Sequence, residues 1–275
     1  MKIEFSNKKS ENGFIYVASR DRVYYELALI SCESLKDYYP DSDVTLFTHK
    51  NFLDHRVNIF DRVITEIPIH TRAKMWCMAR TPYQKTLYND CDSIIRHKDI
   101  RKIHNFLEDC DMFFGSNVMH TVSNYKWGYI DKSRKILPKY HGSLCGFNKT
   151  DINIDFMQTW FEEYIKQYCN PWEYGEEHFE EWKGFDMFTL WRMTSGKFNE
   201  FNRFNDLIIN NIPRRYNNTI HDLPEDYVGN PVITQIDRNI WSTMTNSWKK
   251  IEKGAKDESY KVEKPDSNQI TLEYN

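Results

Sequence analysis

Two carboxylates separated by one residue, Asp90-Cys91-Asp92, form the pair of side chains most suited to chemistry in this chain. They follow the β-forming segment Lys85–Asn89. We expect a buried strand that ends in two carboxylates, which point to the same side because alternate residues of an extended strand do. A divalent cation would relieve their repulsion, and hard oxygen ligands suit Mg²⁺ or Mn²⁺. Such ions bind phosphate oxygens, so the pattern indicates a diphosphate partner.

Composition limits the class of protein. The chain has 275 residues, of which 40% are hydrophobic and 15% aromatic, enough for a sizeable core in one large domain or two small ones. The formal net charge is −3 and the pI about 6.3. A protein that binds mainly a phosphate backbone usually has a basic field, so the overall charge argues mildly against nucleic acid but leaves room for a local basic patch.

The cysteines and the apolar runs predict a reduced, soluble protein. The six cysteines contain no C-x-x-C pair and lie in apolar or strand-like surroundings, which favours free thiols in the cytoplasm. Residues 1–9 contain no apolar stretch, and no apolar run approaches the roughly 20 residues of a membrane span, so we expect neither a secretory signal nor a span. The abundance of Asn, Lys, Ile, Tyr and Phe is typical of AT-rich coding and hints at a viral or bacterial source.

Strand and helix patterns alternate along the chain, which predicts an α/β fold. Strands are expected at 14–19, 44–48, 62–69, 86–89, 112–115, 143–147 and 232–236. Helices are expected at 24–38, 73–80, 99–107, 155–168 and 186–194. Ligands of open α/β sheets bind beyond the carboxyl ends of the strands. The end of the first strand and the Asp90-Cys91-Asp92 segment both lie at such ends.

Further motifs occur in a fixed order between about residue 14 and residue 241. They are Ala18-Ser19-Arg20-Asp21-Arg22-Val23-Tyr24, Lys74 sixteen residues before Asp90, the segment 81–92, His141-Gly142-Ser143-Leu144, Gly184-Phe185-Asp186-Met187, and Ile212-Pro213-Arg214-Arg215-Tyr216-Asn217. This succession resembles that of the GT-A fold glycosyltransferases, near the glycogenin and galactinol synthase group. Each motif is weak alone, and the order and spacing carry the resemblance.

The resemblance implies a GT-A, Rossmann-like fold with a mixed central sheet. It implies one domain over residues 1–248, with a donor-binding half at about 14–115 and an acceptor half at about 116–248; residues 249–275 are a charged C-terminal tail. It also implies a metal-dependent hexosyltransferase-like enzyme that moves a sugar from a UDP-linked donor to a carbohydrate or other glycosylatable acceptor with retention at the anomeric carbon.

The resemblance also assigns residues. Donor and cofactor contacts fall on Ala18, Ser19, Arg20, Tyr24, Lys74, Asp90, Cys91, Asp92, His141 and Gly142. Asp90 and Asp92 would hold Mn²⁺ or Mg²⁺, and Asp186 would face the transferred sugar as the catalytic candidate. The chain departs from the family at Met187, where a Gln is usual, and at the Asn-Ser that normally precedes the glycine. The C-terminal metal-binding His is not readable, which leaves Asp237, Gln235 or His221 as the third ligand.

Each assignment has a simpler interpretation. Lys74 alone would be a solvated helix lysine, and Arg20 a surface ion pair. Asp186 would favour its helix through the dipole, and a histidine such as His141 is more often structural than chemical. The aromatic and acidic stretch 172–182 fits an acceptor-binding wall or a packed lid equally well.

Two other functions remain open from the sequence. A viral-type enzyme that glycosylates modified DNA bases would need a basic stripe, for which the candidates are Lys126, Lys132, Arg134, Lys135 and Lys139. A non-catalytic nucleotide-sugar binding protein would explain the departure at Met187 and the unreadable C-terminal histidine. The sequence does not identify the sugar, the acceptor or the oligomeric state.

Overall fold

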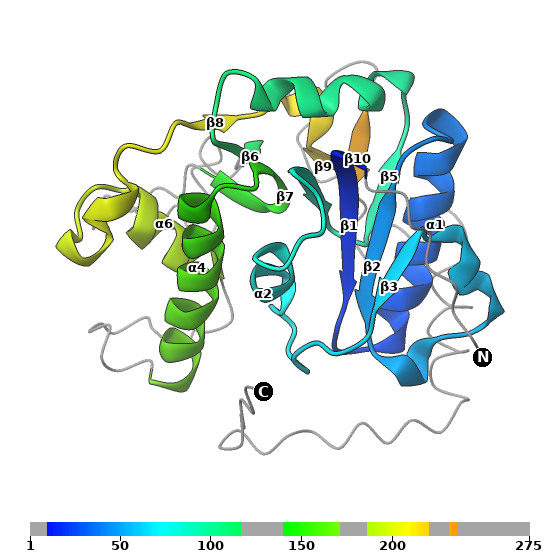
Figure 1. Ribbon diagram of the computed structural model, residues 1–275, viewed down its shortest axis with the longest axis horizontal. Helices are drawn as coiled ribbons and strands as arrows, with labels where there is room; N and C mark the ends of the chain where they lie inside the picture. The colour runs from blue at the N-terminus through cyan, green and yellow to red at the C-terminus, as the bar shows by residue number, and fades with distance from the viewer. Residues whose placement is uncertain (1–9, 117–139, 171–185, 220–230, 236–275) are drawn as a thin grey trace.

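A computed structural model describes residues 10–116, 140–170, 186–219 and 231–235 of the chain (Figure 1). Its strands are β1 (Asn12–Ala18), β2 (Val44–Thr48), β3 (Arg62–Ile64), β4 (Lys85–Asn89), β5 (Ser93–Ile95), β6 (Met112–Ser116), β7 (Tyr140–Asn148), β8 (Ile209–Asn211), β9 (Asn218–Thr219) and β10 (Ile233–Gln235). Its α-helices are α1 (Arg22–Tyr38), α2 (Lys74–Met78), α4 (Asp151–Cys169) and α6 (Asp186–Thr194). Short 3₁₀ helices are η1 (Lys50–Phe52), η2 (His55–Ile59), η3 (Lys98–Leu107), η6 (Asn199–Phe204) and η7 (Arg214–Tyr216).

The central sheet has seven strands in the order β3-β2-β1-β4-β7-β6-β8. Strands β3, β2, β1 and β4 are parallel, β7 is antiparallel to both β4 and β6, and β8 is parallel to β6. The predicted mixed α/β sheet is therefore confirmed. In Figure 1, α1 lies beside the parallel strands and α4 and α6 lie on the other side of the molecule.

Apolar side chains fill both faces of the sheet, which explains the continuous apolar run of β1. Phe14 and Tyr16 belong to the buried cluster that includes α1 and η3, whereas Ile15 and Val17 belong to the one that includes α2, α4 and α6. Helix α1 starts directly after β1, where the Asp21 side chain accepts a hydrogen bond from the Val23 amide (3.0 Å). The residues between β1 and α1 therefore lie at the carboxyl end of a central strand.

The first residues of β7 lie at the edge of the sheet where β1 and β4 end. The pairing of β7 with β6 shifts, because Phe114 pairs with Cys145 and Gly115 with His141. Beyond the end of β4, the Asp90 amide donates a hydrogen bond to the Ser143 carbonyl (2.8 Å). The start of β7 therefore lies beside the turn that carries the two carboxylates.

A second, three-stranded sheet has the order β5-β10-β9. Strand β5 begins immediately after Asp92 and pairs antiparallel with β10, where Gln235 lies opposite Ser93. The sequence pattern predicted no strand between residues 89 and 112, and that prediction is wrong. A three-residue strand gives too little periodicity to be recognised, and its partner lies near the other end of the chain.

Most predicted elements are found with shifted bounds. The expected strand at 62–69 ends at Ile64, and the expected helix at 155–168 begins earlier, at Asp151, where Thr150 accepts a hydrogen bond from the Asn153 amide (3.3 Å). All six cysteines are free; five are buried and Cys169 is exposed. Across the residues described here, no helix combines the length and the apolar character needed to span a membrane.

Candidate active site

The two carboxylates occupy a turn rather than the end of a strand. Strand β4 ends at Asn89, and Cys91 and Asp92 form the turn into β5, so the argument from strand alternation was wrong in its premise. The Cys91 side chain is buried and its thiol contacts the Val17 carbonyl (3.4 Å). Burial, and then the neighbouring Asp90 charge, raise the pKa of Asp92 to about 7. The expected repulsion between the two carboxylates is thus present despite the different backbone.

Tyr88 orients the first carboxylate. Its hydroxyl donates a hydrogen bond to Oδ1 of Asp90. Burial, followed by the charge of Asp90, holds the pKa of Tyr88 well above its ordinary value, so the hydroxyl remains a donor. Tyr88 precedes Asp90 by two residues on a buried strand, and this spacing was the signal by which the sequence could have revealed the pair.

Lys74 joins three segments that are far apart in the chain. It is the first residue of α2 and is buried. Its Nζ donates to the Gly142 carbonyl on β7 (2.7 Å), lies 3.1 Å from Oδ2 of Asp186 on α6, and lies 3.8 Å from Oδ1 of Asp90. A solvated helix lysine would have none of these contacts, so the simpler interpretation of Lys74 is wrong.

Asp186 is a buried carboxylate between two cations. Nε of Arg72 lies 3.4 Å from its Oδ1, opposite the contact with Lys74, and Trp160 donates to its backbone carbonyl (2.9 Å). Burial alone would raise the pKa of this carboxyl, but the charges of Arg72 and Lys74 outweigh burial and lower it to about 2. Asp186 therefore stays ionised at neutral pH and is a weak base.

Gly142 allows β7 to approach these charges closely. A Cβ at this position would lie 3.2 Å from the Trp160 ring and 3.4 Å from both Oδ2 of Asp186 and Nζ of Lys74. The contact with Trp160 is tighter than a Cβ normally makes, so a larger residue would require Trp160 or the strand to shift. Gly142 therefore lies beside Lys74 and Asp186, and its backbone carbonyl accepts the hydrogen bond from Lys74.

The loop after β1 lies at the same edge. Ala18 is buried, and its carbonyl accepts a hydrogen bond from Thr48 (3.0 Å). Ser19 donates to the His70 carbonyl (2.6 Å) and Arg20 to the Thr71 hydroxyl (3.0 Å), which ties the loop to the segment that carries Arg72. Arg20 is an exposed donor to a neutral hydroxyl here. Tyr24 is 38% exposed, and burial followed by the charge of Asp92 raises its pKa, so its ring lies near the second carboxylate.

Arg72 is the main residue that the sequence reasoning missed. Its guanidinium faces Asp186, and it also influences Asp90 and Asp92 electrostatically. Its position two residues before Lys74 was the available signal, but an arginine in a turn has many simpler explanations. Only the fold shows that the turn and α6 meet.

Several predicted residues lie outside the described part of the chain. They are His221, Asp237, Gly184, Phe185, the stretch 172–182, the tail 249–275, and the basic candidates Lys126, Lys132, Arg134, Lys135 and Lys139. Gln235 is described, is buried, and lies opposite Ser93 beside the turn. Within the described ranges, no group of three or more His, Cys, Asp or Glu side chains could hold a metal ion.

Comparisons with known proteins address the fold. No protein-family model and no curated protein sequence matches this chain. Among solved structures, the galactosyltransferase LgtC, in a complex with donor and acceptor sugar analogues, is similar with a TM-score of 0.52 and 11% identity, over 88% of this chain and 96% of that one. The glycosyltransferase GlyE of Streptococcus pneumoniae is similar with a TM-score of 0.58 and 13% identity, over 89% of this chain. The match spans only 60% of the GlyE chain.

At these identities the similarity establishes the fold alone. The chain has the GT-A fold, as the order of its motifs predicted. The glycogenin and galactinol synthase subgroup finds no support among these structures. The residues that would use the fold for chemistry are the ones gathered at the carboxyl edge of β1 and β4.

Proposed function

We propose that this chain is a metal-dependent glycosyltransferase that uses a nucleotide-sugar donor, with UDP as the nucleotide and one catalytic domain over residues 1–248. One observation carries the proposal. Lys74, Asp90, Gly142 and Asp186, which were chosen from sequence patterns, meet within hydrogen-bond or ion-pair distance at the ligand-binding edge of a GT-A fold. Four patterns that matched by chance would not converge in this way.

The two carboxylates fit a divalent cation. Asp90 is partly exposed and one of its oxygens is fixed by Tyr88, while burial, and then the charge of Asp90, raise the pKa of Asp92. A cation removes such repulsion. Asp90 and Asp92 would hold Mn²⁺ or Mg²⁺, which neutralises charge on the departing nucleoside diphosphate. Gln235 ends β10 opposite Ser93 and remains a candidate for the third ligand, as do Asp237 and His221.

The cations supply the remaining charge for the diphosphate. Lys74 and Arg72 share one buried carboxylate, Asp186, so the three groups together carry a surplus positive charge. We propose that Lys74 contacts the diphosphate and that Asp186 faces the transferred sugar. Because both cations hold Asp186 ionised, it is suited to positioning the sugar and orienting the cations. Retention is the stereochemistry that the family resemblance implies.

The proposal is tested by turnover. UDP-glucose, UDP-galactose and UDP-N-acetylglucosamine are incubated with the chain and Mn²⁺, and release of UDP is measured with water and with simple sugars as acceptors. The proposal predicts Mn²⁺-dependent release from at least one donor. If the chain binds a donor with Mn²⁺ but releases nothing, the non-catalytic binding protein replaces the enzyme. No described residue favours a DNA acceptor, so the proposal names only a hydroxyl-bearing acceptor.

A further inference from the structure

Four polar side chains are buried next to the turn that carries Asp90 and Asp92. They are Tyr16 on β1, Ser31 on α1, Asn89 at the end of β4 and Ser93 at the start of β5, and each is at most 1% exposed. They interrupt the apolar cluster between the sheet and α1. Burying polar groups in such a place costs free energy unless they are hydrogen-bonded, so their arrangement serves something other than apolar packing.

Ser93 is the centre of this polar group. Its hydroxyl donates a hydrogen bond to the Asp90 carbonyl (2.8 Å) and accepts one from the side-chain amide of Asn89. The Ser31 hydroxyl lies 3.2 Å from the Ser93 hydroxyl and donates to the hydroxyl of Tyr16 (3.0 Å). One side chain at the start of β5 therefore links the end of β4, the turn and helix α1.

The contact with Ser93 completes the restraint of Asp90. The Asp90 amide donates to the Ser143 carbonyl on β7 (2.8 Å), and the Asp90 side chain accepts from Tyr88. The Ser143 hydroxyl lies 2.5 Å from Nδ1 of His141, which places this predicted donor contact on the β7 side of the turn. Ser93 restrains the Asp90 carbonyl, from which the chain continues to the second carboxylate. The amide, the side chain and the carbonyl of Asp90 are thus held by three different residues.

Ser93 also limits where Asp92 can lie, because the two residues are adjacent. Ser93 lies opposite Gln235 in the small sheet, so its backbone is paired while its side chain is buried. Asp92 therefore lies between a tethered carbonyl at Asp90 and a fixed residue at Ser93. Two carboxylates this close repel each other until a cation binds, and a loose turn would let them separate.

We propose that Ser93 is a positioning residue for the divalent cation, because its hydroxyl holds the turn in the conformation in which Asp90 and Asp92 bind the cation together. The inference rests on the proposed function and extends it to a buried residue that would contact neither the cation nor the donor. A turn held in this conformation in advance loses less freedom on binding, which raises the affinity. Residues that orient metal ligands commonly contribute about 10- to 100-fold to metal affinity.

A matched pair of variants separates this role from a general effect on stability. Ser93→Ala and Thr45→Val each remove one fully buried hydroxyl. Thr45 lies near the amino end of β2, where its hydroxyl is 2.8 Å from the hydroxyl of Tyr83. Both variants should unfold at a lower urea concentration than the wild type, because each loses a buried hydrogen bond. Calorimetry then measures UDP binding to each folded protein at a series of fixed Mn²⁺ concentrations.

The Mn²⁺ concentration that gives half-maximal UDP binding should rise by about 10-fold in Ser93→Ala. At saturating Mn²⁺ the variant should bind UDP within about twofold of the wild-type affinity, because the nucleotide contacts are intact. Thr45→Val should follow the wild-type Mn²⁺ dependence despite its lower stability. An equal rise in both variants would make Ser93 a structural residue only, and an unchanged Mn²⁺ dependence in Ser93→Ala would overturn the proposal.

A second variant serves if Ser93→Ala does not fold by circular dichroism. Ser93→Cys fills the same site with a weak donor, and the same rise in the Mn²⁺ requirement is expected. A wild-type chain whose UDP binding does not depend on Mn²⁺ contradicts the proposed function and the role of Ser93 with it. Mn²⁺-dependent binding in the wild type that the Ser93 variant leaves unchanged contradicts the role of Ser93 alone.

Discussion

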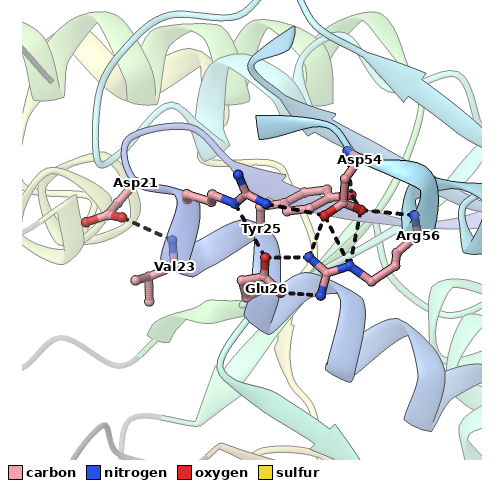
Figure 2. A network of polar contacts seen from close by, with 7 residues as sticks. Asp21, Val23, Tyr25, Glu26, Asp54 and Arg56 are labelled. Atoms are coloured by element: carbon pink, nitrogen blue, oxygen red, sulfur yellow. Dashed lines mark hydrogen bonds and ion pairs between the residues drawn. The ribbon is translucent and has the colours of Figure 1, made fainter. Parts of the chain in front are cut away.

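Two clusters of charged side chains use the same residue types in different ways. The first joins α1 to η2, where Arg56 binds Glu26 through two contacts of 2.6 Å and also binds Asp54 (Figure 2). Arg22 pairs with both acids, and Tyr25 donates to Asp54 (3.1 Å). Two positive and two negative groups balance, and the Arg56 side chain remains 43% exposed. This cluster has the geometry of a structural clamp.

The second cluster joins α2, α6 and the turn after β4, and its charges are matched less well. Lys74 and Asp186 are almost completely buried, yet the ion-pair distances are 3.1 to 3.8 Å. Burying charges in imperfect pairs costs stability, whereas the clamp balances its charges and keeps Arg56 partly in solvent. The difference indicates that the second cluster is arranged for a ligand.

The largest expected effect concerns Asp186. Asp186→Asn should reduce Mn²⁺-dependent turnover by about 100-fold or more, because a positioned charge is lost from the transition state. UDP affinity should be unchanged or slightly higher, since Lys74 and Arg72 lose a competing carboxylate. Steady-state UDP release and calorimetry measure the two quantities. Near-normal turnover would reduce Asp186 to a helix-terminal residue.

Lys74→Ala tests the next largest effect. UDP affinity should fall by about 1–3 kcal/mol, as expected for losing a charge-assisted contact with the diphosphate. The loss should be equal for UDP and UDP-sugars because both share the phosphates. Arg56→Ala, in the other cluster, is the matched control and should leave both affinities unchanged. Equal affinities in the Lys74 variant and the control would remove Lys74 from the donor site.

The clamp has its own pH signature. Although burial acts against it, hydrogen bonding to Arg56 lowers the pKa of Asp54 from 3.8 to about 2. The native state thus binds fewer protons than the unfolded state, so this stabilisation is complete above about pH 4 and is lost as the pH falls through 2. Asp54→Asn should cost about 1–2 kcal/mol at pH 7, after allowance for solvent screening. Urea titrations at pH 7 and pH 3 should show the difference between wild type and variant shrinking at the lower pH; a constant difference contradicts the clamp.

The smallest expected effect is the change in stability when the buried pair of Lys74 and Asp186 is replaced by apolar residues. The double variant Lys74→Met with Asp186→Leu should cost less stability than the two single changes added together, because it removes both members of a buried pair. Asp186→Leu should be the more costly single change, since it leaves both Lys74 and Arg72 without their shared carboxylate, whereas Lys74→Met leaves Asp186 paired with Arg72. Denaturant unfolding of all three variants gives the coupling. If the double variant is as unstable as the singles together, the buried pair is structural.

The sequence predicted the elements whose periodicity is strong. Strand Val44–Thr48 and the helix Asp186–Thr194 have the expected bounds, because buried strands and amphipathic helices have regular patterns. The three-residue strands β5 and β8 were missed, since their pairing depends on distant segments and not on local propensity.

The site was predicted to the extent that spacing could reveal it. Lys74 lies 3.8 Å from Asp90, to which its spacing in the sequence linked it, and Gly142 lies beside Lys74 and Asp186. The contact of Arg72 with Asp186 was not visible, because it depends on which side chains meet across the fold. The charge state of Asp186 was likewise undetermined until its two cations were known.

The central claim is that the carboxylates after β4 bind a nucleoside diphosphate through a divalent cation. Calorimetric titration of UDP, with and without Mn²⁺, into wild type, Asp92→Ala and the clamp variant Asp54→Asn tests it directly. The account predicts Mn²⁺-dependent UDP binding in wild type and in Asp54→Asn, and its loss in Asp92→Ala, with all three proteins folded by circular dichroism. UDP binding with Mn²⁺ that is as tight in Asp92→Ala as in wild type would contradict the account.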